Sequence, residues 1–161
     1  MGLFETPYRP KVAMPLKPLE IGVELFTLAC IIANLALFAH YWPLLPGAPT
    51  EGINRLSLFL FVTLLPMVVY LGATVMGLFP RGFSYPVPIT AENAAREYRL
   101  GTNMLRSVKA EVALCMLDVE WVFINIGMGE DMSLSTEFVI VFLGILVITI
   151  LFFLYEMNRQ K

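Results

Sequence analysis

The amino-acid sequence predicts an all-α fold: an integral membrane bundle of four transmembrane helices, the third extended by a cytoplasmic, amphipathic and basic helix. Hydrophobic residues make up 58% of the 161 residues and charged residues 15%, against roughly 25% charged in an average soluble domain. The mean hydropathy is +0.74. The chain has several separate apolar stretches but is too short for a second core. We therefore expect residues 1–161 to form a single membrane domain.

The first two spans are predicted at residues 21–42 and 56–79. As a helix, the first would reach roughly 33 Å, enough to cross a hydrocarbon core of about 30 Å. Residues 1–20 contain four prolines and three cations, which is typical of an extended cytoplasmic arm and not of a cleaved signal peptide. Pro66 lies near the middle of the second span, so we expect a kink there.

The third and fourth spans are predicted at residues 112–128 and 138–155. The third is the least apolar, because it contains Asp118, Glu120 and Asn125. The fourth consists almost entirely of Phe, Leu, Ile and Val. Such a composition is typical of a helix that is surrounded by lipid or by other apolar helices.

Residues 80–111 are predicted to be a cytoplasmic link and helix. Thr90 follows a Pro-rich extended stretch at a position typical of an N-cap, and Glu92 falls in the first turn. Nothing breaks the helix before about Gly127, so it would continue through the membrane for about 54 Å. Its cytoplasmic part has small and apolar residues on one face and a basic face on the other, formed by Arg96, Arg99, Arg106 and Lys109.

The distribution of Lys and Arg predicts the orientation, since cytoplasmic segments carry the positive residues. All of the 11 Lys and Arg residues except Arg55 fall in the arm, the 80–111 link or the C-terminal tail. We therefore expect a membrane protein with both termini in the cytoplasm. The basic face has two open interpretations: it lies near anionic lipid headgroups and enforces topology, or it binds an acidic protein.

Ionisable groups within a span are costly, and they usually face the bundle interior and mark function. The candidates are Asp118, Glu120, Glu24, His40 and Asn125. Asp118 is the strongest, because it lies near the middle of the third span. It would either hydrogen-bond to another helix, through a side chain such as Asn34 or Thr63, or belong to a proton or ion path.

Other chemistry is not indicated by the sequence. It contains no nucleophile elbow, phosphate-binding glycine loop or zinc-protease motif. One histidine and two separated cysteines give no metal-ligand spacing. A net charge of −2 argues against nucleic-acid binding. We expect no enzyme activity and no cofactor.

Several motifs follow one another along most of the chain. The first are Arg9-Pro10-Lys11, residues 15–20 and residues 41–46. A second group precedes and begins the long helix and includes Tyr85, Pro86, Ile89, Thr90, Glu92, Asn93 and Tyr98, and the last motif is Glu120-Trp121. Together they resemble domain-of-unknown-function family 1648, whose members are small prokaryotic membrane proteins, and a related domain forms the N-terminal half of SdpI-type bacteriocin immunity proteins. The resemblance implies a location in the prokaryotic plasma (inner) membrane.

The resemblance leaves three functions open. The first outer link departs from the family pattern, because Pro49-Thr50 is followed by Glu51 and not by His-Phe. This departure favours an accessory or structural subunit that packs against other membrane proteins in a larger complex. The resemblance itself implies a signalling or immunity module that holds a cytoplasmic partner. An ion or proton carrier using Asp118 is the third interpretation.

Overall fold

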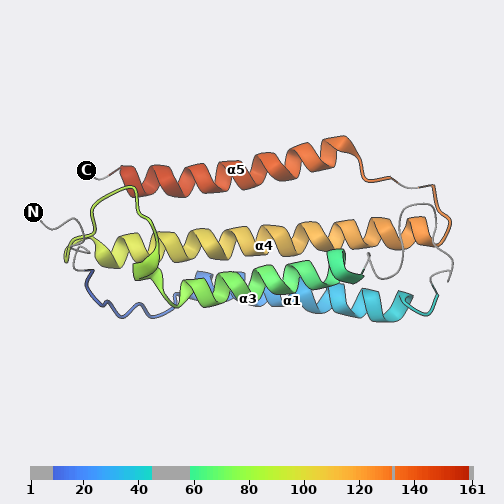
Figure 1. The fold of residues 1–161 in the computed structure, drawn as a ribbon, viewed down its shortest axis with the longest axis horizontal. Coiled ribbons are helices and arrows are strands. Elements are labelled where there is room, and N and C mark those ends of the chain that lie inside the picture. Colours follow the sequence, from blue (N-terminus) through green and yellow to red (C-terminus); the bar gives the residue numbers. More distant parts are fainter. Residues whose placement is uncertain (1–8, 45–58, 132, 160–161) are drawn as a thin grey trace, which may run out of the picture.

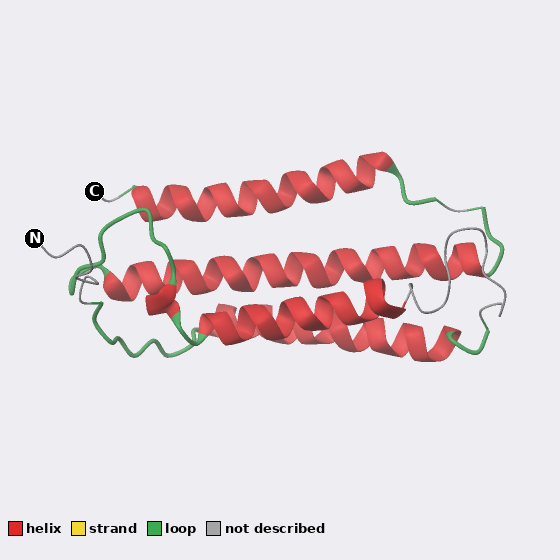
Figure 2. Ribbon diagram, in the orientation of Figure 1, coloured by secondary structure: helices red, strands yellow, loops and turns green. Residues whose placement is uncertain are grey.

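The computed structural model describes residues 9–44, 59–131 and 133–159. Within these residues it contains four α-helices and no strand, which confirms the all-α prediction (Figure 2). The helices lie lengthwise beside one another, with α4 in the middle, α1 and α3 along one side and α5 along the other (Figure 1). The start of α1 and the end of α5 lie at the same end of the bundle.

Helices α1 (Pro18–Tyr41) and α5 (Thr136–Asn158) correspond to the first and fourth predicted spans. Both are long and apolar enough to cross a membrane. Helix α1 begins at a proline, whose missing N–H costs nothing in the first turn. Helix α5 begins with a capping bond of 3.0 Å in which the Phe138 N–H donates to the Ser135 hydroxyl.

The second predicted span is helical where it is described, as a π-helical turn η1 (Phe59–Leu64) followed by α3 (Leu65–Gly77). Its predicted first residues, 56–58, lie outside the described part of the chain. The change from π to α geometry occurs beside Pro66. Proline cannot donate the bond that an α-helix would make to the carbonyl of Val62, and an irregular turn relieves this conflict.

Helix α4 (Ala94–Gly127) contains the third predicted span and its cytoplasmic extension. The Thr90 N–H donates to Asn93 Oδ1 at 2.8 Å, and the Asn93 N–H donates to the Thr90 hydroxyl at 3.3 Å. These reciprocal bonds close the turn that precedes the helix. The N-cap is Asn93, which makes no side-chain capping bond, so the helix begins a few residues after the start predicted at Thr90. A short 3₁₀ turn, η2 (Pro80–Gly82), precedes this region.

The loop before α4 folds back on its first turns. Tyr85 packs against Tyr98 with ring centroids 5.7 Å apart, and against Phe83 at 6.1 Å. A Cβ placed on Gly101 would lie 3.0 Å from both the Phe83 ring and the Tyr85 hydroxyl. Gly101 therefore allows the close approach of loop and helix. Gly72 of α3, in contrast, has no atom within 4 Å of its ideal Cβ.

Two sides of α4 differ within the predicted span. Ala113, Glu120 and Ile124 are buried toward the other helices. Leu114 and Trp121 are exposed, and so is Asp118. The expectation that Asp118 faces the bundle interior is therefore wrong. Two positions correspond to about 200° of rotation around an α-helix, so the packing that buries Glu120 turns Asp118 outward.

Candidate functional site

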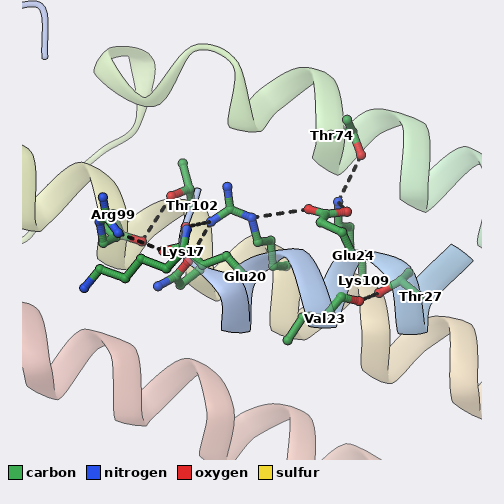
Figure 3. A network of polar contacts seen from close by, with 11 residues as sticks. Lys17, Glu20, Val23, Glu24, Thr27, Thr74, Arg99, Thr102 and Lys109 are labelled. Atoms are coloured by element: carbon green, nitrogen blue, oxygen red, sulfur yellow. Dashed lines mark hydrogen bonds and ion pairs between the residues drawn. The ribbon is translucent and has the colours of Figure 1, made fainter. Parts of the chain in front are cut away.

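A cluster of ion pairs joins the first turns of α1 to the N-terminal half of α4 (Figure 3). Lys109 Nζ lies 2.7 Å from Glu24 Oε2, and Arg106 Nε lies 3.3 Å from Glu24 Oε1. Glu20 lies one turn earlier on α1 and pairs with Arg99 at 3.4 Å and Arg106 at 3.8 Å. Two carboxylates thus hold three cations between two helices.

Lys109 is the most buried cation of this cluster, with its side chain 2% exposed. Its ammonium donates to the Thr74 hydroxyl of α3 at 3.0 Å and lies 4.6 Å from the centre of the Tyr70 ring. The sequence placed Lys109 on a solvated basic face, and the structure corrects this. Because Lys109 of α4 contacts both α1 and α3, it connects three helices.

Arg96 extends the basic face toward α5. Its guanidinium lies 2.9 Å from Glu97 and donates to the backbone carbonyl of Glu156, near the end of α5. All four cations predicted for the basic face therefore have partners within the chain. Glu20 was not among the predicted site residues. The sequence feature that pointed to it is its spacing of four from Glu24, which places both carboxylates on one face of α1.

The arm and the loop after α3 are joined at the same end. Arg9 donates to the carbonyls of Arg81 and Phe83, the latter at 2.6 Å, and its guanidinium lies 5.9 Å from the Tyr85 ring centre. The Tyr85 hydroxyl donates to the Pro80 carbonyl at 2.8 Å, and burial raises the pKa of Tyr85. Residues of the proposed family signature thus fix the arm to the loop.

Glu97 is a buried carboxylate at the start of α4, 1% exposed. One oxygen pairs with Arg96, and the other accepts no hydrogen bond from the described residues. Burial raises the pKa of Glu97, and the nearby Arg96 lowers it in part. This group makes the folded state sensitive to pH.

A cavity of about 1080 Å³ lies beside the ion-pair cluster. Its wall is formed by the arm, the first turns of α1, the end of α3, the η2 turn and the N-terminal half of α4. Glu20, Glu24 and Lys109 reach this wall, together with the exposed residues Lys11 and Arg81. The cavity therefore combines charged groups with the apolar surface of three helices.

The remaining intramembrane candidates do not gather at one place. Glu120 is fully buried, and its oxygens accept no hydrogen bond from the described residues, although Asn34 lies beside it. Asn125 donates to the Trp121 carbonyl of its own helix at 2.7 Å. His40 is exposed and packs edge-on against Tyr41.

A proton path through Asp118 would need further ionisable groups in line with it, and Glu24, Glu111 and His40 do not supply them. Glu24 belongs to the ion-pair cluster, whereas Glu111 accepts a 2.5 Å hydrogen bond from Thr149 on α5. Asp118 and His40 are exposed. The proposed hydrogen bond from Asp118 to another helix is absent among the described residues. The four groups point in different directions because α1 and α5 contact different sides of α4.

No group of three or more His, Cys, Asp or Glu side chains suited to a metal ion occurs in the described parts of the chain. Cys30 and Cys115 are buried and unpaired with each other. Comparisons with family models, curated proteins and solved structures find no match to this chain. The functional argument therefore depends on the geometry and on the sequence motifs.

Proposed function

We propose that this chain is a non-catalytic, multi-pass membrane protein that packs as an accessory or structural subunit against a larger membrane complex. Helices α1 and α5 supply two spans. The η1–α3 segment and the membrane half of α4 supply the other two, with both termini on the cytoplasmic side. The motifs between Phe79 and Trp121 support membership of family 1648.

The exposed position of Asp118 is the observation that carries this proposal. Asp118 lies in the predicted span, and its side chain forms no hydrogen bond or ion pair with the described residues. Leu114 and Trp121 flank it on the same exposed side, at 44% and 45% exposure. A charge that faces hydrocarbon is costly. A partner helix with a cation or a hydrogen-bond donor at this depth would remove that cost.

Helix α5 supports the same conclusion. Only 6% of its most apolar 18-residue stretch is buried inside the structure. Its exposed apolar side chains include Ile140, Ile148 and Phe152, each at 56% exposure or more. Lipid accommodates such a surface by itself. Together with the uncompensated Asp118 on the neighbouring helix, it gives the bundle a broad face for other membrane subunits.

The test is purification from the native membrane in a mild detergent, followed by mass spectrometry of co-migrating proteins. The wild type is compared with Asp118→Asn and with Asp131→Asn, a control in the exposed outer link. We expect larger membrane subunits at fixed stoichiometry with the wild type and the control, and their loss with Asp118→Asn. A lone monomer or homo-oligomer of the wild type would contradict the proposal.

Ion or proton transport is a second candidate function, and Glu120 is the residue that favours it. A buried carboxylate without hydrogen-bond partners among the described residues is an unusual feature of a helical bundle. If Glu120 carries the ion, Glu120→Gln abolishes flux in liposomes and Asp118→Asn does not. Unchanged flux in Glu120→Gln would exclude this function. The immunity-module alternative has less support, because the cations it requires already have partners.

A further inference from the structure

The cavity beside the ion-pair cluster has an excess of positive charge. Five cations and two carboxylates line it: Lys11, Arg81, Arg99, Arg106 and Lys109, with Glu20 and Glu24. The two carboxylates are engaged by three of these cations at distances of 2.7 to 3.8 Å. A surplus of three positive charges therefore remains: one within the ion-pair cluster, and two at Lys11 and Arg81.

Lys11 and Arg81 have no carboxylate partner among the described residues. Both side chains are exposed, and the Arg81 guanidinium donates a hydrogen bond of 3.5 Å to the Arg9 carbonyl. Because Arg9 also donates to the Arg81 and Phe83 carbonyls, the arm and the η2 turn are held together. Lys11 follows Arg9 by two residues, and both Lys11 and Arg81 line the cavity.

The cavity is also lined by exposed apolar side chains. Leu16, Leu78 and Phe79 line the cavity and are 52%, 70% and 67% exposed. Leu78 and Phe79 follow the end of α3, and Leu16 precedes the start of α1. All three lie at the level where these helices leave the proposed spans. Exposed apolar side chains next to cations are typical of the membrane interface, where acyl chains meet charged headgroups.

We infer that this cavity binds a phosphate group, with Lys11 and Arg81 as its direct cationic ligands. The apolar rim favours a phospholipid of the cytoplasmic leaflet as the source: the phosphate enters the cavity and the acyl chains lie along Leu78 and Phe79. Glu20 and Glu24 do not repel it strongly, because Arg99, Arg106 and Lys109 neutralise them. Charge-assisted contacts from Lys and Arg are the strong form of phosphate recognition.

The purified full-length protein in a zwitterionic detergent allows a direct test by native mass spectrometry and thermal unfolding. The probes are phosphatidylglycerol, diacylglycerol with the same acyl chains and no phosphate, and inorganic phosphate. The site variant is Lys11→Gln/Arg81→Gln. The matched control, Lys17→Gln/Arg159→Gln, removes two exposed cations that do not line the cavity.

Phosphatidylglycerol should bind the wild type and the control with similar affinity. It should bind the site variant at least about tenfold more weakly, since the loss of a single charge-assisted contact weakens binding by about that factor. If inorganic phosphate competes with the lipid as well as free phosphatidylglycerol does, the phosphate site is retained and its ligand is soluble. Equal binding of diacylglycerol, or unchanged binding by the site variant, would overturn the inference. Neither result depends on whether other subunits co-purify.

Discussion

Lys109 of α4 and Glu24 of α1 form an ion pair of 2.7 Å in which the lysine side chain is 2% exposed and the glutamate 24%. The two residues differ in their remaining partners. Glu24 keeps Arg106 at 3.3 Å, whereas Lys109 keeps the neutral Thr74 hydroxyl and the Tyr70 ring. The pair is therefore asymmetric, because loss of the carboxylate leaves a buried charge without a counter-charge.

This asymmetry predicts different costs for the two single substitutions. Glu24→Gln should lower the free energy of unfolding by about 3 kcal/mol, since it strands a buried ammonium. Lys109→Met should cost less, and the double variant should be more stable than Glu24→Gln alone. Denaturant unfolding in detergent micelles measures all three. If the two single variants lose equal free energies of unfolding and these losses add up in the double variant, the pair does not couple α1 to α4.

Gly101 and Gly72 give a matched pair of glycine substitutions. Gly101→Ala should destabilise the protein by about 1–3 kcal/mol, because its Cβ would meet the Phe83 and Tyr85 rings. Gly72→Ala should stabilise it by about 0.5–1 kcal/mol, since alanine favours the helix and the space is open. Thermal unfolding in detergent distinguishes the two signs. A stabilising Gly101→Ala would show that the loop does not pack on α4.

The raised pKa of Glu97 predicts a pH dependence of stability. The folded protein holds this proton more tightly than the unfolded chain, so the contribution is most favourable at low pH. It is lost as the pH rises from the ordinary carboxyl pKa of 4.5 through the raised value. Glu97→Gln should flatten this part of the stability curve, whereas Glu92→Gln, at an exposed neighbouring site, should not. The measurement is the unfolding midpoint across this range, and an unchanged slope in Glu97→Gln would refute the assignment.

Glu120 is predicted to cost stability in the structure as it stands. Its carboxylate is fully buried and accepts no hydrogen bond from the described residues. Glu120→Met should therefore stabilise the bundle by about 1–3 kcal/mol, since an apolar side chain of similar volume removes an unsatisfied group. Asp118→Asn, on the exposed side, should change stability in detergent by less than about 0.5 kcal/mol. A strongly destabilised Glu120→Met would instead mean that the carboxylate holds an ion or a water molecule.

The four-span topology predicts a labelling pattern in a cysteine-free background in which Cys30 and Cys115 are replaced by alanine. Cysteine at Glu130 should react with a membrane-impermeant reagent in intact cells. Cysteine at Glu92 or Arg159 should react only after permeabilisation, because the proposed topology puts both positions in the cytoplasm. If α1 and α5 were the only spans, Glu92 would lie outside and react in intact cells. The result at Glu92 therefore separates two spans from four.

The elements of this protein follow closely from local patterns. Thr90 was predicted to cap the long helix, and it forms reciprocal bonds with Asn93 in the turn before Ala94, where the helix begins. The first and fourth predicted spans differ from α1 and α5 by only a few residues at each end. The candidate site was predicted less completely. The four cations of the basic face were found, but the burial of Lys109 and the role of Glu20 as the carboxylate partner of Arg99 and Arg106 were not.

The sequence by itself determined that the described chain is helical and, to within a few residues, where α1 and α5 lie. It predicted four spans, and two of the helices, α1 and α5, are long and apolar enough to cross a membrane. Capping residues, prolines and apolar composition act within one helix or turn, so they can be interpreted without knowing its neighbours. Tertiary structure alone decided that Asp118 points outward, that Glu120 is buried and that Glu24 pairs with Lys109. Those outcomes depend on how α4 is rotated against α1, α3 and α5, and this rotation is set by contacts between residues distant in the sequence.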